Sequence, residues 1–150
     1  MNLTKRVLYK KAKPADFRCP EQNHLLVQQM RGFVLQENGI GLAAPQIGIS
    51  RRVFVMETQG WHRACFNPEI TSASENLVDF DEGCLSFPGE HCIITRPDWI
   101  DVKYQDWAGE WHSERFSGVL ARCFQHELDH LDGITMWQRQ KEQYAEQSGN

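Results

Sequence analysis

The sequence predicts an α+β domain in which antiparallel strands surround a central buried helix, with a first helix packed outside. Three observations support this. Hydrophobic residues recur at helical spacing near the start, and short β-prone segments with turn residues between them come next. A late segment is then apolar over more than half of a helical circumference. The 150 residues suit a single domain, residues 1–150, because no repeat or linker divides them.

The first helix is predicted over residues 21–37. Its apolar positions form one stripe, made by Leu25, Leu26, Met30, Phe33 and Val34. The helical pattern ends at residues 38–39, an Asn-Gly pair that is typical of a turn. A segment punctuated by glycines, residues 39–48, follows it.

The middle of the chain is predicted to form short strands. The β-prone segments are residues 52–56, 64–67, 92–95, 99–104 and 110–116. Residues 106–109, Asp-Trp-Ala-Gly, have the composition of a hairpin connection, and prolines separate the other segments. Short connections of this kind favour antiparallel pairing.

The last clear helix is predicted over residues 118–131. At about 100° per residue, one flank carries Val119, Cys123, His126 and His130. Glu127 lies beside that flank, and leucines continue the apolar arc, so this helix should pack inside the domain. The polar tail, about residues 138–150, is expected to begin as a short helix and then fray.

Composition and charge exclude several classes of protein. The net charge of −4 argues against nucleic acid as a partner. The basic run of residues 5–13 is interleaved with apolar residues and is interpreted as a solvated surface. No signal sequence and no membrane span are recognised. Five cysteines, an odd number without a secretion signal, favour free thiols in the cytoplasm over a disulfide framework.

Residues 126–130, His-Glu-Leu-Asp-His, predict a metal site. Histidines four residues apart lie on one helix face and can bind a divalent cation, while Glu127 between them handles protons. A catalytic site needs a third protein ligand and one open position. Cys84, in a glycine-containing turn, is the best candidate, and Cys92 is its competitor. Glu82 is either a turn carboxylate or a partner of Arg96 that supports a ligand.

Three segments together resemble the signature motifs of the peptide deformylases. They are residues 39–46 (Gly-Ile-Gly-Leu-Ala-Ala-Pro-Gln), 82–86 (Glu-Gly-Cys-Leu-Ser) and 125–130 (Gln-His-Glu-Leu-Asp-His). They occur in the family's order and at similar spacings, which makes the likeness far more specific than the last motif alone. The resemblance covers roughly residues 7–137. It implies that the fold is deformylase-like, with the metal on the central helix.

The resemblance also implies a function: a metal-dependent hydrolase that removes the formyl group from the N-terminal formyl-methionine of new polypeptides and releases formate. The implied metal ligands are Cys84, His126 and His130. Glu127 would act as general base and acid, and Gln46 with the backbone N–H of Leu85 would stabilise the oxyanion. The expected substrate-binding residues are Gly39, Ile40, Gly41, Gly89, Val119 and Cys123.

The same resemblance implies one divalent cation, natively Fe²⁺, with Zn²⁺, Ni²⁺ or Co²⁺ able to occupy the same ligands. The expected partner is an N-formylmethionyl peptide in the cytoplasm, with no nucleic acid and no membrane. Two features depart from the usual family pattern. Many bacterial members carry a basic or bulky residue soon after the second motif that helps bind the substrate backbone; here residues 87–91 are Phe-Pro-Gly-Glu-His, so that contact is expected to differ. The C-terminal tail is short, which weakens the expectation of ribosome docking.

Two alternatives stay open from the sequence. A zincin-type metalloprotease would take its third ligand downstream of His130, where Glu142 and Glu146 are available. A catalytically silent deformylase-like module would bind peptides without turnover, although the presence of Gln46 and Glu127 argues against that.

Overall fold

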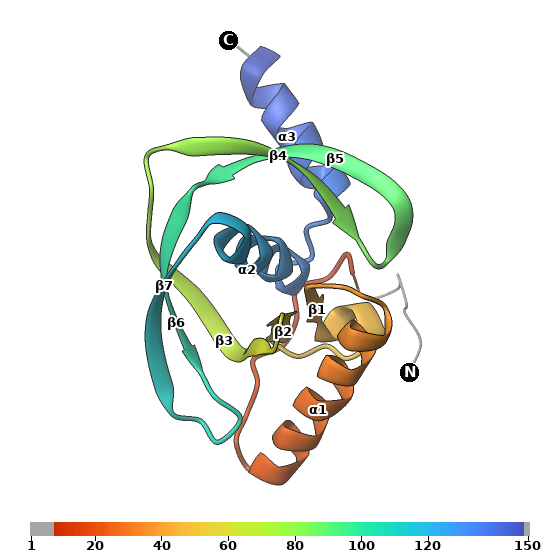
Figure 1. The fold of residues 1–150 in the computed structure, drawn as a ribbon, viewed down its shortest axis with the longest axis vertical. Coiled ribbons are helices and arrows are strands. Elements are labelled where there is room, and N and C mark those ends of the chain that lie inside the picture. Colours follow the sequence, from red (N-terminus) through yellow and green to blue (C-terminus); the bar gives the residue numbers. More distant parts are fainter. Residues whose placement is uncertain (1–7, 149–150) are drawn as a thin grey trace.

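A computed structural model describes residues 8–148, and these form an α+β fold, as predicted (Figure 1). Lys5 and Arg6 of the basic run lie outside the described residues, whereas Lys10, Lys11 and Lys13 are exposed. No helix within residues 8–148 combines the length and the apolar character needed to cross a membrane.

Five strands form one antiparallel sheet in the order β1-β2-β3-β6-β7. Their bounds are Gly41–Ala43 (β1), Val53–Thr58 (β2), Trp61–Ala73 (β3), Trp99–Gln105 (β6) and Trp111–Ser117 (β7). A second, two-stranded antiparallel sheet pairs β4 (Leu77–Cys84) with β5 (Phe87–Pro97). The predicted hairpin at residues 106–109 connects β6 to β7.

The two sheets meet at a corner, where the β3–β6 pair continues into the β4–β5 pair. The Ser74 N–H donates to the Trp99 carbonyl at 2.9 Å, and the Asp98 N–H donates to the Asn76 carbonyl at 3.0 Å. Beyond that corner the β4–β5 hairpin arches over the central helix, as Figure 1 shows. Cys84 therefore lies at the end of a hairpin that is anchored at its other end.

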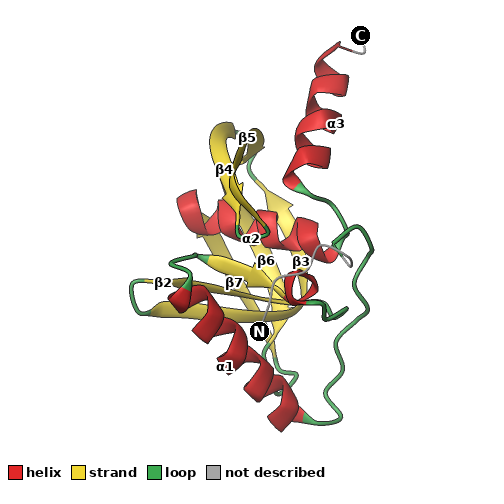
Figure 2. Ribbon diagram, turned by 90° about the vertical axis from the view of Figure 1, so that its right-hand side faces the viewer, coloured by secondary structure: helices red, strands yellow, loops and turns green. Residues whose placement is uncertain are grey.

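Strand β2 is buried on both faces and separates two hydrophobic clusters. Val53 and Val55 pack with the first helix, α1 (Pro20–Gln36), whereas Phe54 and Met56 point toward the central helix. This two-sided burial explains why residues 53–56 are uniformly apolar instead of alternating. The sheet is thus sandwiched between the two helices, as the side view in Figure 2 makes clear.

The central helix, α2 (Gly118–Leu131), has the predicted bounds and lies between the two sheets. Its Phe124 is fully buried, with its ring centroid 4.9 Å from that of Phe54 and 5.8 Å from that of Phe116. The first turn follows the extended residue Ser117, and the helix ends one residue before Asp132. Packing on two sides fixes α2, and with it the histidines of its last two turns.

The structure corrects the sequence-based description at two points. Strands β1 and β4 were not predicted, because β1 has only three residues and β4 carries three acidic side chains, which disfavour strands. Leu25 does not belong to the buried stripe of α1: it is 53% exposed, and Asn23 and Val27 are buried instead. The stripe is rotated toward Val27 because α1 meets the sheet through Leu26, Met30 and Val34.

The C-terminal tail is helical as far as it is described. Helix α3 (Met136–Ser148) lies against β5, where Met136 packs with Leu8 and Ile94. The Gln143 side chain pairs with both backbone groups of Thr95 at the outer edge of β5: it accepts from the N–H at 3.1 Å and donates to the carbonyl at 2.8 Å. Fraying of the last residues stays a prediction.

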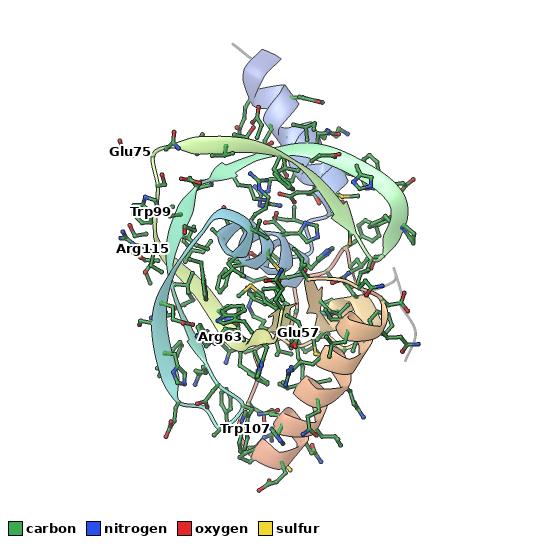
Figure 3. All side chains as sticks on the ribbon, in the orientation of Figure 1. Glu57, Arg63, Glu75, Trp99, Trp107 and Arg115 are labelled. Carbon is green, nitrogen blue, oxygen red and sulfur yellow. The ribbon has the colours of Figure 1, made fainter. Side chains whose placement is uncertain are left out.

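The outer face of β6 and β7 is polar and aromatic and lies far from α3. Figure 3 labels Trp99 and Arg115 on this face, where the guanidinium stacks 3.9 Å from the indole centroid. Arg115 also forms an ion pair with Asp101 at 2.7 Å. Both partners of this surface arginine, Trp99 and Asp101, belong to β6 and not to α2.

We expect Phe124→Ala to lower the free energy of unfolding by about 3–5 kcal/mol, because it leaves a cavity between two aromatic rings in the main core. Denaturant unfolding followed by fluorescence would measure the change. The exposed Leu25→Ala in α1 is the matched control and should change stability by less than about 0.5 kcal/mol. Equal losses in the two variants would contradict the central position of Phe124.

Candidate active site

Three side chains that the sequence predicted as metal ligands converge between α2 and the end of β4. His126 and His130 lie one turn apart on α2, and their Nε2 atoms are 3.2 Å apart. The Cys84 Sγ atom lies 3.3 Å from the Nε2 of His130. All three donor atoms are within 4.8 Å of one another.

This donor set fits a divalent cation. Ligand bonds of about 2.0–2.3 Å around a four-coordinate ion place neighbouring donors about 3.3–3.6 Å apart. The distances between the described donors are close to those values. A thiolate with two imidazoles also suits zinc or ferrous iron better than magnesium or calcium, which prefer oxygen.

Glu82 orients His126 from the far side of the ring. Its Oε1 atom lies 2.8 Å from the His126 Nδ1, so Nε2 faces Cys84 and His130. Arg96 donates to both oxygens of this buried carboxylate, at 2.6 and 2.9 Å. The structure thus supports the second of the two interpretations of Glu82. Burial by itself would raise the pKa of Glu82, but the hydrogen bonds from Arg96 and His126 lower it to about 2.

The two histidines carry opposite pKa shifts. Burial by itself would lower the pKa of His126, but hydrogen bonds to Cys84 and Glu82 raise it to about 10. Burial and the neighbouring His126 hold the pKa of His130 well below its ordinary value. The pair of imidazoles thus favours one proton, on His126, and disfavours a second one on His130. A cation bound there would displace the proton, as metal ligands require.

Glu127 lies on α2 beside His126 and is 4% exposed. Its Oε1 atom is buried and makes no hydrogen bond to any residue among 8–148. Burial, the largest cause, raises the pKa of this carboxyl to about 7, although nearby His126 opposes the shift. A carboxyl with a pKa near neutrality can both accept and return a proton.

Gln46 is held so that its amide nitrogen faces the end of β4. The Gln46 Oε1 accepts from the Ala43 N–H at 2.9 Å, which leaves Nε2 to donate to Ser86 at 3.1 Å and toward the Cys84 sulfur at 3.5 Å. The side chain is almost completely buried in the short helix η1 (Ala44–Ile47). An uncharged donor thus lies next to the proposed ligand.

The backbone of Gly41 runs unusually close to α2. A Cβ atom added there would lie 2.7 Å from both the Cys123 sulfur and the Glu127 Oε2. At Gly39 an added Cβ would lie 3.0 Å from the Leu85 side chain. The two glycines therefore allow β1 and the two residues before it to pass close to Leu85 and α2.

A cavity of about 740 Å³ opens beside these residues. The predicted substrate-binding, oxyanion and proton-transfer residues all line it, namely Gly39, Ile40, Gly41, Gly89, Val119, Cys123, Gln46, Leu85 and Glu127. Val119 and Ile40 are half exposed at the rim, whereas Cys123 is buried. The cavity reaches Cys84 and His126, so a ligand in it would contact the donors directly.

The other ligand candidates lie elsewhere. Cys92 is buried in the separate cluster with Leu8 and Met136. Glu142 and Glu146 are exposed on α3, outside the group formed by Cys84 and the histidines. A second group of potential ligands at residues 106–112 lies on the β6–β7 hairpin, where Asp106 accepts two N–H bonds of its own turn.

Arg122 and Phe80 are among the lining residues of the cavity that the sequence-based search did not identify. Arg122 could not be found from local patterns, because its partners are 28 to 44 residues earlier in the chain. Phe80 belongs to the strand that was not predicted. The sequence signal for that strand is weak, because apolar and acidic residues alternate only over residues 78–81.

Comparison with known proteins gives one consistent result. A sequence model of the polypeptide deformylase family matches residues 1–146. A peptide deformylase of Picosynechococcus is 39% identical over 145 residues, which cover 93% of this chain and 77% of that protein. The Thermotoga maritima peptide deformylase is 42% identical over 133 residues, covering 89% and 80%.

Solved structures agree. The crystal structure of the Thermotoga maritima enzyme has a TM-score of 0.85 at 40% identity and covers 93% of this chain and 97% of its own. A probable peptide deformylase from Synechococcus phage S-SSM7 has a TM-score of 0.85 at 38% identity, covering 92% and 96%. A class I type b peptide deformylase from Acinetobacter baumannii with Met-Ala-Ser bound has a TM-score of 0.85 at 32% identity, covering 92% and 94%.

Gly41→Ala should destabilise the protein by about 1–3 kcal/mol, because the added methyl group would overlap Cys123 and Glu127. Gly32→Ala is the matched control: nothing lies within 4 Å of its added Cβ, and alanine favours the helix by about 1 kcal/mol. Urea unfolding of both variants measures the two changes. If Gly41→Ala were as stable as Gly32→Ala, the close approach at β1 would be wrong.

Proposed function

The chain belongs to the polypeptide deformylase family, and on that premise we propose that Cys84, His126 and His130 hold its catalytic cation. It is an enzyme that removes the formyl group from N-terminal formyl-methionine and releases formate. The family is metal-dependent. The observation that supports this ligand set best is the convergence of one sulfur and two Nε2 atoms beside the buried Glu127.

The identity of the cation is proposed as Fe²⁺, with Zn²⁺, Ni²⁺ or Co²⁺ able to occupy the same donors. The thiolate and imidazoles of the ligand set are compatible with each of these ions. A divalent cation held there supplies Lewis-acid chemistry, because it lowers the pKa of water from about 15.7 toward about 7 and provides hydroxide near neutral pH. A thiolate ligand beside ferrous iron also predicts sensitivity to oxidation.

Glu127 is proposed to move the proton. Hydrolysis of the formamide breaks the bond between the formyl carbon and the methionine nitrogen, while water supplies an oxygen to the carbon and a proton to the nitrogen. The carboxylate of Glu127 accepts the proton of the attacking water and returns it to the departing nitrogen. Its unpaired, buried Oε1 and its pKa of about 7 suit both steps.

Gln46 and the backbone N–H of Leu85 are proposed to stabilise the negative charge that develops on the formyl oxygen. The contact with the Ala43 N–H fixes the Gln46 amide, so its donor faces the Cys84 end of the site before substrate arrives. A preorganised donor of this kind is typically worth about 10²–10³ in rate.

The substrate backbone is proposed to lie along Gly39–Gly41 as an added strand, opposite Gly89. Gly41 places no side chain between that segment and α2, and Gly39 places none between it and Leu85, so main-chain pairing with a peptide is possible. Val119, Cys123 and Ile40 wall the adjoining cavity and would surround the methionine side chain. The Met-Ala-Ser peptide bound by the Acinetobacter baumannii relative makes formyl-Met-Ala-Ser a suitable test substrate.

Nascent formylated chains are made in the cytoplasm, so we propose that the enzyme acts there without nucleic acid or membrane as a direct partner. Docking on the ribosome is the weaker part of this proposal. The described tail is the helix α3 (Met136–Ser148), and only the side of it that does not pack on β5 is available for such a contact.

The protease alternative finds less support than deformylation. Its candidate ligands Glu142 and Glu146 are on α3, while Cys84 lies beside His130. The silent-module alternative requires a defect in the proton or oxyanion residues, yet Glu127 and Gln46 both line the cavity beside the proposed ligands.

Iron-loaded protein, purified without oxygen, should release formate from formyl-Met-Ala-Ser. Glu127→Ala should keep its metal and lose at least about 10²-fold in kcat, because Glu127 is the buried carboxyl beside the proposed ligands whose Oε1 has no hydrogen-bond partner among residues 8–148. Coupled formate assays together with elemental analysis give both quantities. A wild-type rate in Glu127→Ala would exclude it as the general base, and binding of peptide without formate release by the wild type would favour the silent module.

Cys84→Ala should reduce metal content strongly, since it removes one of three ligands, whereas Glu142→Ala should retain the wild-type content. Elemental analysis of the two proteins, prepared in parallel, measures this. The protease alternative predicts the reverse pattern.

A further inference from the structure

The β4–β5 hairpin carries Cys84 a long way from the point where its main chain is anchored. The anchoring hydrogen bonds lie at the corner, next to Leu77 and Pro97. Strand β4 has eight residues, so at about 3.3 Å per residue Cys84 lies roughly 23 Å along the strand from Leu77. The distance between its sulfur and the histidines of α2 therefore depends on side-chain contacts between hairpin and helix.

Arg122 makes three of those contacts from α2. Its Nη1 donates to the Ile94 carbonyl on β5 at 3.0 Å, and its Nη2 donates to the Val78 carbonyl on β4 at 2.5 Å. Nη1 also donates to the Glu82 carboxylate at 2.6 Å. The guanidinium is 5.3 Å from the centre of the Phe80 ring, and the side chain is 12% exposed. One planar group thus reaches the main chain of both strands and a carboxylate.

The carboxylate that Arg122 binds is the one that orients a proposed ligand. Glu82 Oε2 accepts from Arg122 and Arg96, while Oε1 accepts from Arg96 and lies 2.8 Å from His126 Nδ1. A shift of Glu82 would therefore rotate the His126 ring away from Cys84. Groups that fix a ligand in this way typically affect metal affinity or activity about 10- to 100-fold.

Other contacts of the hairpin act at different places, and Gln125 of α2 binds the Pro97 carbonyl at the anchored end at 3.1 Å. Arg96 links Glu82 to Asp129 on α2, at 2.6 and 2.9 Å, through side chains alone. Gln46 holds the far end of the hairpin through Ser86. Arg122 holds the hairpin over the stretch from Val78, beside the anchored end, to Glu82, two residues before Cys84, and it contacts both strands there.

We propose that Arg122 is a positioning residue of the metal centre. By binding Val78, Ile94 and Glu82 together, it sets the distance between the Cys84 sulfur and the His126 ring. This inference rests on the proposed ligands Cys84, His126 and His130. Although Arg122 lines the substrate cavity, its donors are directed at the hairpin, so its effect is on the metal and not on peptide binding.

The test compares cobalt-loaded wild-type protein with Arg122→Met, which keeps an unbranched aliphatic side chain and removes every donor. The thiolate-to-cobalt absorption reports the bond to Cys84, and the visible d–d bands report the ligand geometry. We expect altered bands in Arg122→Met, cobalt affinity lowered by about 10- to 100-fold in chelator competition, and a lower kcat with KM little changed. Arg115→Met removes an arginine from the outer face of β7 and should match the wild type in all three measurements.

Arg122→Lys is the second variant. It keeps the charge and most of the packing, so it tests the role even if Arg122→Met does not fold, and its single ammonium cannot satisfy three acceptors on two strands and a carboxylate. We expect a lowered cobalt affinity here as well. If the variant that folds has the cobalt bands and cobalt affinity of the wild type, the positioning role of Arg122 is wrong. A raised KM with unchanged metal binding would also contradict that role. Neither result would bear on the ligand set. Absence of thiolate absorption in the wild type would overturn the ligand set on which the inference rests.

Discussion

The buried carboxylate of Glu82 is the interaction on which the arrangement of the site depends. An ionised group at 5% exposure costs several kcal/mol to desolvate unless charged donors surround it. Arg96, Arg122 and His126 supply those donors, and they come from β5 and α2, whereas Glu82 belongs to β4. Satisfying one charge therefore brings together two strands and a helix. The proposed ligand Cys84 follows Glu82 by two residues in β4, so the same contacts hold it near the histidines.

Much of the fold was predictable from the sequence because its strongest signals are local. The bounds of α2 follow from a hydrophobic period that changes sharply at Gly118 and after Leu131. Strand β4 was not predictable by the same reasoning. Its Asp79, Asp81 and Glu82 disfavour strands, and only the pairing with β5 stabilises the extended backbone. The rotation of the α1 stripe away from Leu25 likewise depends on where the sheet lies, which periodicity does not specify.

Of the proposed site, the metal ligands could be predicted from the sequence, but the residue that positions them could not. Cys84, His126 and His130 were selected by residue type and motif order, and the structure places their donor atoms next to one another. Arg122 was not selected, because an arginine on a helix ordinarily indicates a solvated edge. Its three acceptors are a carboxylate and two carbonyl groups 28 to 44 residues earlier in the chain, and no local pattern encodes such contacts. The proposed ligands could thus be found from sequence motifs, whereas a residue that positions them, such as Arg122, is recognised only from the tertiary structure.

The pairing of Gln143 with Thr95 has a consequence for the behaviour of the protein in a crowded solution. An unpaired strand edge offers N–H and carbonyl groups to the strands of other molecules and so promotes aggregation. The primary amide of Gln143 occupies both groups of Thr95, as a neighbouring peptide unit would. Helix α3 thus blocks part of the β5 edge of the two-stranded sheet from pairing with strands of other molecules. Residues of the same hairpin also line the cavity.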